Sequence, residues 1–316
     1  MTQGMCLLRI CRRFRLGWAP LVAGVSVSLL FAGCSRGDVE HGGDGGDEAA
    51  AGSHEITGEV VKVDAERGTL LVAHDEIPGF MPAMTMEFQV APIDLKAAKE
   101  GQRIRATMYQ TPEGFRLEKV WPLDPVAEKV VNDAAEALHR DTLTRGKTAY
   151  RAIGENLPDF ALYNQDGELV QPARFRGKQL LINFIYTRCP DPHMCPLATT
   201  KMIQVQEAAK AAGITDLELI SITLDPEFDT PAVLHAYAEA RGIDTSNFSF
   251  LTGPEQAIKD LMAQLGVLAF EDGPLIKHTI ATVLTDRNGR IIHREDGTKW
   301  DPQVFIERMR RAESSG

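Results

Sequence analysis

A strand followed directly by a cysteine-containing loop and a helix constrains this chain most. The segment KQLLINFIYT, residues 178–187, is a short apolar run rich in β-branched and aromatic residues, as in a buried strand. Pro196 suits the first position of a helix, and apolar residues then repeat at helical spacing until Gly213. The connecting loop is YTRCPDPHMCP, residues 186–196. This order of elements predicts one unit of an α/β domain.

The loop holds Cys189 and Cys195, with His193 between them. Two intervening prolines exclude a continuous helix, so a folded-back loop can bring both sulfurs together. We expect Cys195 at the N-cap of the following helix, where the helix dipole and nearby Arg188 favour the thiolate. Thiolate is both a metal ligand and a nucleophile, so we predict a metal or redox site. A structural disulfide in an exported protein is the alternative.

Two further segments are predicted to reach the same edge of the sheet. A second strand, residues 218–224, runs into the loop DPEFDTP, residues 225–231, and open α/β sheets place their sites at the carboxyl ends of such strands. His278 precedes the strand TIATVLTD instead. It joins the edge only if that strand runs antiparallel to the others. DRNG, residues 286–289, then predicts a hairpin turn.

The N-terminal segment has the pattern of an export signal. Four arginines precede an apolar run that ends in LLFAGC at Cys34. This segment resembles a bacterial lipoprotein signal, which implies removal of residues 1–33 and lipidation of Cys34. By the same resemblance, Ser35 after the lipidated cysteine favours the outer membrane over the inner one. The alternative to a cleaved lipoprotein signal is an uncleaved membrane anchor. Residues 34–53, rich in glycine and acid, are predicted to be a flexible tether facing the periplasm.

The charge of the chain argues against nucleic acid as a partner. The net charge is −10, and removal of the first 33 residues takes away four arginines and no acids, leaving about −14. No basic cluster remains to neutralise phosphates.

In residues 54–122 apolar and polar residues alternate with a period of two. Five such strand-like runs are separated by turn residues, which predicts a small β-barrel. Met84 and Met86 share one face of the third run, with Met81 just before it and His74 ending the second run. Methionine on a strand is often only core filler. Thioethers beside an imidazole, however, suit Cu(I) or Ag(I).

The segment HDEIPGFMPAMTMEF resembles the CusF-like periplasmic copper-binding domains. The resemblance implies a small all-β OB-type barrel with His74, Met84 and Met86 as Cu(I) ligands. Met81 corresponds to the family's tryptophan that caps the metal, next to Phe80, and is a candidate fourth sulfur.

Residues 123–150 are predicted to form a connector with a helix that begins near Pro125. Apolar positions including Val126 and Leu138 are expected on its packing face. The helix could dock on either domain.

The remainder, residues 151–316, resembles the SCO/SenC family of thioredoxin-like copper proteins. The resemblance is carried by five segments, which are FIYTRCP, the second Cys-Pro, ITLDPEFDTP, FLTG and KHTIATVLTDRNGRI. It implies an α/β thioredoxin-like domain with copper held by Cys189, Cys195 and His278. Most members have three residues between the cysteines and this chain has five, so His193 is a further candidate ligand.

These features favour an extracytoplasmic copper metallochaperone, tethered to the membrane through Cys34. The resemblance implies assembly of the CuA centre of cytochrome c oxidase, with subunit II of that enzyme as acceptor. One alternative is a thiol-disulfide oxidoreductase in which Cys189 and Cys195 are catalytic. The other is a copper buffer for tolerance.

Overall fold

The computed structural model describes residues 52–146, 149–273 and 275–313. Within these ranges no helix is both long enough and apolar enough to cross a membrane. The predicted signal of residues 1–33 and the lipidation of Cys34 lie outside the described residues.

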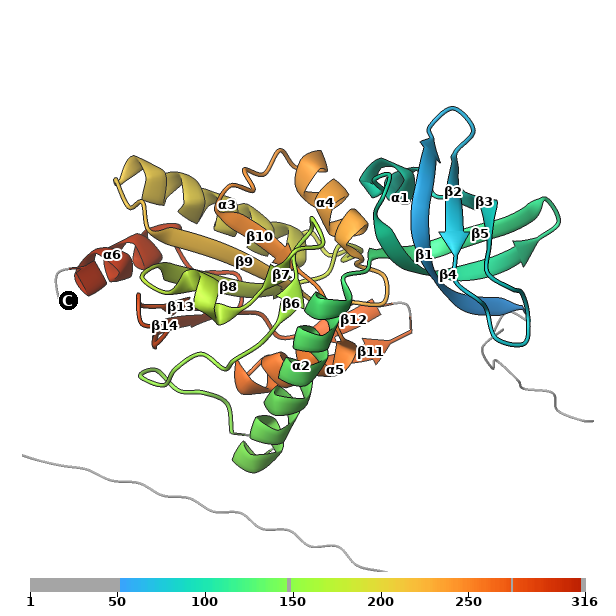
Figure 1. Ribbon diagram of the computed structural model, residues 1–316. Helices are drawn as coiled ribbons and strands as arrows, with labels where there is room; N and C mark the ends of the chain where they lie inside the picture. The colour runs from blue at the N-terminus through green and yellow to red at the C-terminus, as the bar shows by residue number, and fades with distance from the viewer. Residues whose placement is uncertain (1–51, 147–148, 274, 314–316) are drawn as a thin grey trace, which may run out of the picture. The chain divides into compact units, whose positions relative to one another are not determined.

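The first domain is a five-stranded, mostly antiparallel sheet in the order β1-β2-β3-β5-β4 (Figure 1). The sheet closes on itself because its two end strands, β1 and β4, also pair with each other. The strands are β1 (Ser53–Asp64), β2 (Thr69–His74), β3 (Met84–Val90), β4 (Arg103–Thr111) and β5 (Gly114–Pro122). All five predicted strands are confirmed. The short helix α1 (Pro92–Ala97) was not predicted. Apolar side chains such as Leu70 and Phe88 fill the interior.

Gly58 lets β1 lie unusually close to β2. A Cβ atom at this position would lie 2.7 Å from the Cα atom of His74 and 2.7 Å from the carbonyl oxygen of Ala73. Real Cβ atoms do not approach other atoms so closely, so only glycine fits here without a shift of the backbone. The close approach fixes the position of His74 at the end of β2.

The second domain has a five-stranded sheet in the order β10-β9-β8-β13-β14 (Figure 1). The strands are β8 (Gln179–Ile185), β9 (Leu217–Thr223), β10 (Phe248–Leu251), β13 (Ala281–Thr285) and β14 (Ile291–Asp296). The first three are parallel, and β13 runs antiparallel to β8. Every residue of β8 and β9 is buried, which explains their largely apolar sequence. The antiparallel last strand and its hairpin turn are confirmed.

Helices and two small hairpins complete this domain. The helices are α3 (Cys195–Ala211), α4 (Pro231–Ala240), α5 (Glu255–Gln264), α6 (Pro302–Glu313) and the 3-10 turn η1 (Pro172–Phe175). The hairpins are β6 (Leu162–Tyr163) with β7 (Leu169–Val170), and β11 (Ala269–Asp272) with β12 (Leu275–His278). Because α3 packs on β8, β9 and α6, its first turn is held at the carboxyl edge of the sheet.

The connector helix α2 (Pro125–Arg145) packs against α5 and places Leu138 in the core of the second domain. It begins at the predicted proline. The predicted packing face is wrong at Val126, which is 75% exposed, whereas Ala127 and Val131 are buried. The shift is confined to the start of the helix, where Ala127 and Val131 pack with Ala161 and Tyr163, while Leu138 is buried as predicted.

Candidate metal centre

The loops that follow β8 and β9 meet at one edge of the sheet, as predicted. The backbone N–H of Thr187 donates to the carboxylate of Asp229 at 3.1 Å, and the hydroxyls of Thr187 and Thr223 donate to the same carboxylate. Asp229 is completely buried, and this burial raises its pKa to about 6. These bonds fasten the start of the cysteine loop to the loop after β9.

Arg188, next to the first cysteine, contacts the same loop. Its guanidinium donates to the carboxylate of Asp225 at 2.6 and 3.0 Å and lies 4.2 Å from the ring centroid of Phe228. The prediction that Arg188 favours the thiolate of Cys195 is therefore wrong. The ion pair with Asp225 directs the guanidinium to the β9 loop instead.

Cys195 is the first residue of α3 and is completely buried. The N-cap is Met194, so the predicted N-cap position of Cys195 is wrong by one residue. Burial raises the pKa of the Cys195 thiol well above its ordinary value. The desolvation of the sulfur thus outweighs the field of the helix N-terminus, and a cation or metal ion is needed to hold this sulfur as a thiolate.

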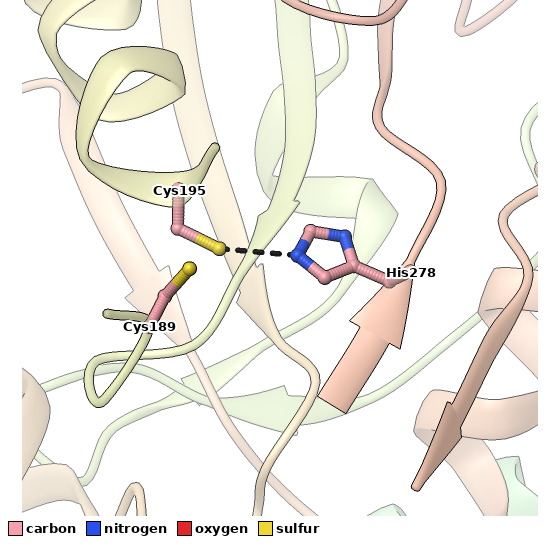
Figure 2. A group of neighbouring side chains, drawn as sticks. All are labelled: Cys189, Cys195 and His278. Atoms are coloured by element: carbon pink, nitrogen blue, oxygen red, sulfur yellow. Dashed lines mark hydrogen bonds between the residues drawn. The ribbon is translucent and has the colours of Figure 1, made fainter. Parts of the chain in front are cut away.

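Three side chains from separate parts of the sequence form one cluster (Figure 2). The Sγ atoms of Cys189 and Cys195 and one ring nitrogen of His278 all lie within 4.8 Å of one another. The Sγ atom of Cys195 is 3.3 Å from Nε2 of His278, which stands at the end of β12. His193 is exposed and is not part of this cluster.

The imidazole of His278 is held in one tautomer. Its Nδ1–H donates to the carbonyl oxygen of Thr279 at 3.0 Å, because a carbonyl only accepts. Nε2, on the sulfur side, therefore carries the free lone pair when the ring is neutral. Burial lowers the pKa of His278, which favours the neutral ring. The nitrogen that faces the two cysteines is the one ready to bind a metal ion.

The chemistry of this cluster fits copper. Both cysteines are free thiols. Two sulfurs and an imidazole nitrogen are soft to borderline donors that suit Cu(I), and they do not suit Mg²⁺ or Ca²⁺, which prefer oxygen. The same two sulfurs are also close enough together for dithiol chemistry after a small movement of the loop.

A second set of soft donors lines the first domain. His74 is 3% exposed; its Nδ1–H donates to the carbonyl of Asp75 at 2.7 Å, and its buried Nε2 has no hydrogen-bond partner. Met84 lies directly opposite His74 on the neighbouring strand, and Met86 lies opposite Val72. These side chains therefore share the inner face of the sheet. The unpaired buried Nε2 of His74 and two thioethers on the same face of the sheet are the donor types that suit Cu(I).

The loop before β3 brings an aromatic ring to the same domain. Met81 bridges to Ile77 and packs partly buried against the barrel core, whereas Phe80 is 40% exposed. The Phe80 ring stacks on the imidazole of His54, with centroids 4.0 Å apart. The assignment of Met81 as cap or fourth sulfur stays a prediction. Sequence reasoning missed His54, which lies 20 residues before His74 and shows no motif.

Sequence reasoning also missed Tyr186, whose ring meets that of His278 edge to face at 5.8 Å. Its position in the sequence could have indicated that it lies near the site. Tyr186 is the first residue after the buried strand and stands three positions before Cys189, so it starts the loop that holds the ligands.

The fold and the cluster define a thioredoxin-like protein with a soft-metal or dithiol site. The SCO1/SenC family model matches residues 150–313, more than half of the chain, and the chain therefore belongs to the SCO1/SenC family. The model of the copper binding periplasmic protein CusF matches residues 53–122, so the first domain is CusF-like.

Several known proteins are similar to the SCO1/SenC part. A SCO2-like protein of Rickettsia conorii is 34% identical over 141 residues, which is 42% of this chain and 66% of that protein. The SCO1 protein homolog of Bacillus subtilis is 31% identical over 149 residues, 45% of this chain and 75% of that protein. The structure of Bradyrhizobium japonicum ScoI with copper bound is 30% identical, with a TM-score of 0.41; the match covers 52% of this chain and 99% of that one.

Proposed function

We propose that this protein is an extracytoplasmic copper metallochaperone. Its CusF-like domain captures copper, and its thioredoxin-like domain holds and delivers it. The observation that carries the proposal is the cluster of Cys189, Cys195 and His278, whose donor atoms lie within 4.8 Å of one another. The acceptor is a protein with its own soft ligands, such as subunit II of cytochrome c oxidase during assembly of its CuA centre.

The two domains are suited to different steps. In the CusF-like domain, an OB-type barrel in this proposal, the thioethers of Met84 and Met86 need not lose a proton to bind Cu(I) beside His74. In the thioredoxin-like domain each cysteine gives up its thiol proton when copper binds, so the two thiolates bind more tightly than thioethers. Such a difference in donor strength favours capture at the first site and storage at the second.

The proposed place of work is the bacterial cell envelope. Cleavage before Cys34 and lipidation of its sulfur would anchor the protein, and residues 34–53 would serve as the tether. We place it at the periplasmic side and in the outer rather than the inner membrane, on the sequence pattern around Cys34.

Copper titration of the reduced full chain tests the proposal. Cys189→Ser and Cys195→Ser should each weaken binding at the thioredoxin-like site by roughly 1,000-fold, about 4 kcal/mol, because each removes a thiolate. His278→Ala should weaken it less. The matched control is His193→Ala, which removes an exposed imidazole from the same loop.

Two results would contradict the proposed ligand set. The first is copper binding by His278→Ala that equals the wild type. The second is a loss of binding in His193→Ala comparable to that in the cysteine variants, which would make the loop histidine a ligand.

Oxidation should act as a gate on copper binding, because one pair of sulfurs cannot be a disulfide and two thiolate ligands at once. When the cysteines are oxidised to a disulfide, the thioredoxin-like domain should release its copper. Reduction should restore one copper at this site. Retention of copper by the fully oxidised protein would contradict the assignment.

A thiol-disulfide oxidoreductase is the second candidate, favoured by the two adjacent free thiols on a thioredoxin-like fold. In that reaction one thiolate attacks a partner's disulfide, and the second thiolate resolves the mixed disulfide. Two electrons pass to the partner, which leaves with two thiols, while Cys189 and Cys195 become a disulfide. Exchange would then fail in either cysteine variant and persist in His278→Ala, with or without copper.

A copper buffer for tolerance is the third candidate. A buffer holds copper, whereas a metallochaperone passes it on. Mixing the loaded protein with an apo fragment that presents the CuA ligands distinguishes them, because only the metallochaperone should transfer its copper faster than copper dissociates into solution.

A further inference from the structure

The loop between β14 and α6, residues 297–301, is anchored in the core of the thioredoxin-like domain. Trp300 is 6% exposed, and its ring meets that of Phe305 on α6 edge to face, with centroids 4.9 Å apart. The ammonium group of Lys201 on α3 donates to the carbonyl oxygen of Trp300 and lies 4.9 Å from the centroid of its ring. This loop is therefore a fixed part of the domain.

Thr298 in this loop reaches the middle of the cysteine loop. Its hydroxyl donates to the carbonyl oxygen of His193 at 3.2 Å, although the two residues are 105 positions apart. The preceding residue, Gly297, donates its backbone N–H to the carbonyl oxygen of Ile280 at 2.8 Å, two residues after His278. The anchored loop thus ties the cysteine loop to the segment that carries the third candidate ligand.

Formation of a disulfide requires the cysteine loop to move. Cys189 and Cys195 are free thiols in this structure, and an S–S bond needs sulfurs about 2 Å apart. Cys195 is buried in the first turn of α3, whereas Cys189 is partly buried and lies in the loop. Oxidation should therefore displace Cys189 and the residues after it rather than the helix, and the carbonyl group of His193 should move with them.

We propose that Thr298 is a positioning residue that holds the cysteine loop in its dithiol conformation and so sets the balance between the two thiols and their disulfide. This inference rests on the copper function proposed above, because only the dithiol form can bind copper through both sulfurs. Oxidation forms the S–S bond and releases two protons and two electrons, which a small disulfide such as oxidised glutathione takes up to become two thiols. The hydrogen bond from Thr298 is made in the dithiol form and is lost when the loop moves, so it favours the reduced protein.

The test is Thr298→Val in the full chain, which removes the hydroxyl and keeps the branched side chain. The protein is equilibrated with reduced and oxidised glutathione without copper, and mass spectrometry of the trapped protein measures the Cys189–Cys195 disulfide. The equilibrium constant for its formation should rise about fivefold, the typical effect of losing one hydrogen bond. For a two-electron couple this lowers the reduction potential by about 20 mV. Thr298→Ser keeps a hydroxyl and should retain the wild-type potential.

The matched control is Thr200→Val. The hydroxyl of Thr200 donates to the carbonyl oxygen of Pro196 at 2.9 Å within α3, so this bond does not tie the cysteine loop to another segment. Its loss should leave the reduction potential as in the wild type. Thermal unfolding of each reduced variant verifies that the domain is folded.

The outcomes separate the role of Thr298 from the function on which it rests. A reduced wild type that binds no copper at the cysteine site overturns the proposed function, and the glutathione equilibrium, measured without copper, still decides the role of Thr298. An unchanged or raised potential in Thr298→Val overturns that role alone. Equal shifts in Thr298→Ser or in Thr200→Val also overturn it, because the hydroxyl of Thr298 would then not be the cause.

Discussion

At the scale of single residues, burial controls the ionisable groups around the cysteine loop. Cys195 and Asp229 are both completely buried, and burial raises the pKa of each. The carboxyl of Asp229 holds the loop start through Thr187, so its ionisation is tied to the geometry of the site. Replacing this one side chain should reveal how much stability the buried charge costs.

We expect Asp229→Asn to flatten part of the pH dependence of stability. The folded-state pKa of Asp229, about 6, lies above its ordinary value of 3.8. The stabilisation that comes with protonation is therefore fully present below about pH 4 and is lost as the pH rises through about 6. The stability of the wild type relative to Asp229→Asn should fall by about 3 kcal/mol over this window.

Chemical unfolding of both reduced proteins at several pH values between about 4 and 7 measures the difference. Other titrating groups are common to both proteins and cancel in the comparison. A difference that stays constant across the window would mean that Asp229 is already ionised at the lower end.

At the scale of elements, the sequence predicted the strands better than the contacts between them. The five runs of the first domain and the β8-loop-α3 unit were recognised because period and turn residues are local properties. The buried positions at the start of α2, the ion pair of Arg188 and the ring contact of Tyr186 depend on segments distant in the sequence. The pairing of Cys189 with Cys195 was predicted from the prolines of their loop, whereas His278 was assigned as the third ligand only through resemblance to a family.

The inner face of β3 leads to a prediction for the first domain. Along this face Phe88 is fully buried, Met86 is partly buried and Met84 is 47% exposed, beside the unpaired nitrogen of His74. In a Cys189→Ser/Cys195→Ser background, Met84→Ile with Met86→Ile should lower Ag(I) affinity at least 100-fold, about 3 kcal/mol.

The control for this prediction is Met108→Ile in the same background. Met108 is fully buried in the core of the same domain, on β4. A swap of similar volume should cost less than about 1.5 kcal/mol of stability and leave Ag(I) affinity unchanged. Equal Ag(I) affinity in the double methionine variant and the control would identify Met84 and Met86 as core filler.

At the scale of the whole molecule, the chain joins a CusF-like domain to a SCO1/SenC domain behind a predicted lipid anchor. We expect mass spectrometry of the membrane-extracted protein to find an N-terminus at Cys34 that carries lipid. The signal should remain uncleaved in Cys34→Ala. In the control variant Cys11→Ala, which changes a cysteine within the signal, cleavage should be normal. A mature protein that starts at another residue would refute the lipoprotein prediction.

The sulfur-containing residues Met84 and Cys195 differ in solvent exposure, and this difference should affect how fast a bound metal ion exchanges at each site. An incoming ligand can approach a metal ion beside Met84 from solvent, so exchange there should proceed by ligand addition and should be fast. Cys195 is fully buried and Cys189 is partly buried, so we expect ligand exchange at a metal ion held by these two sulfurs to be slower. The proposed function therefore predicts short dwell times of copper at the first site and longer ones at the second.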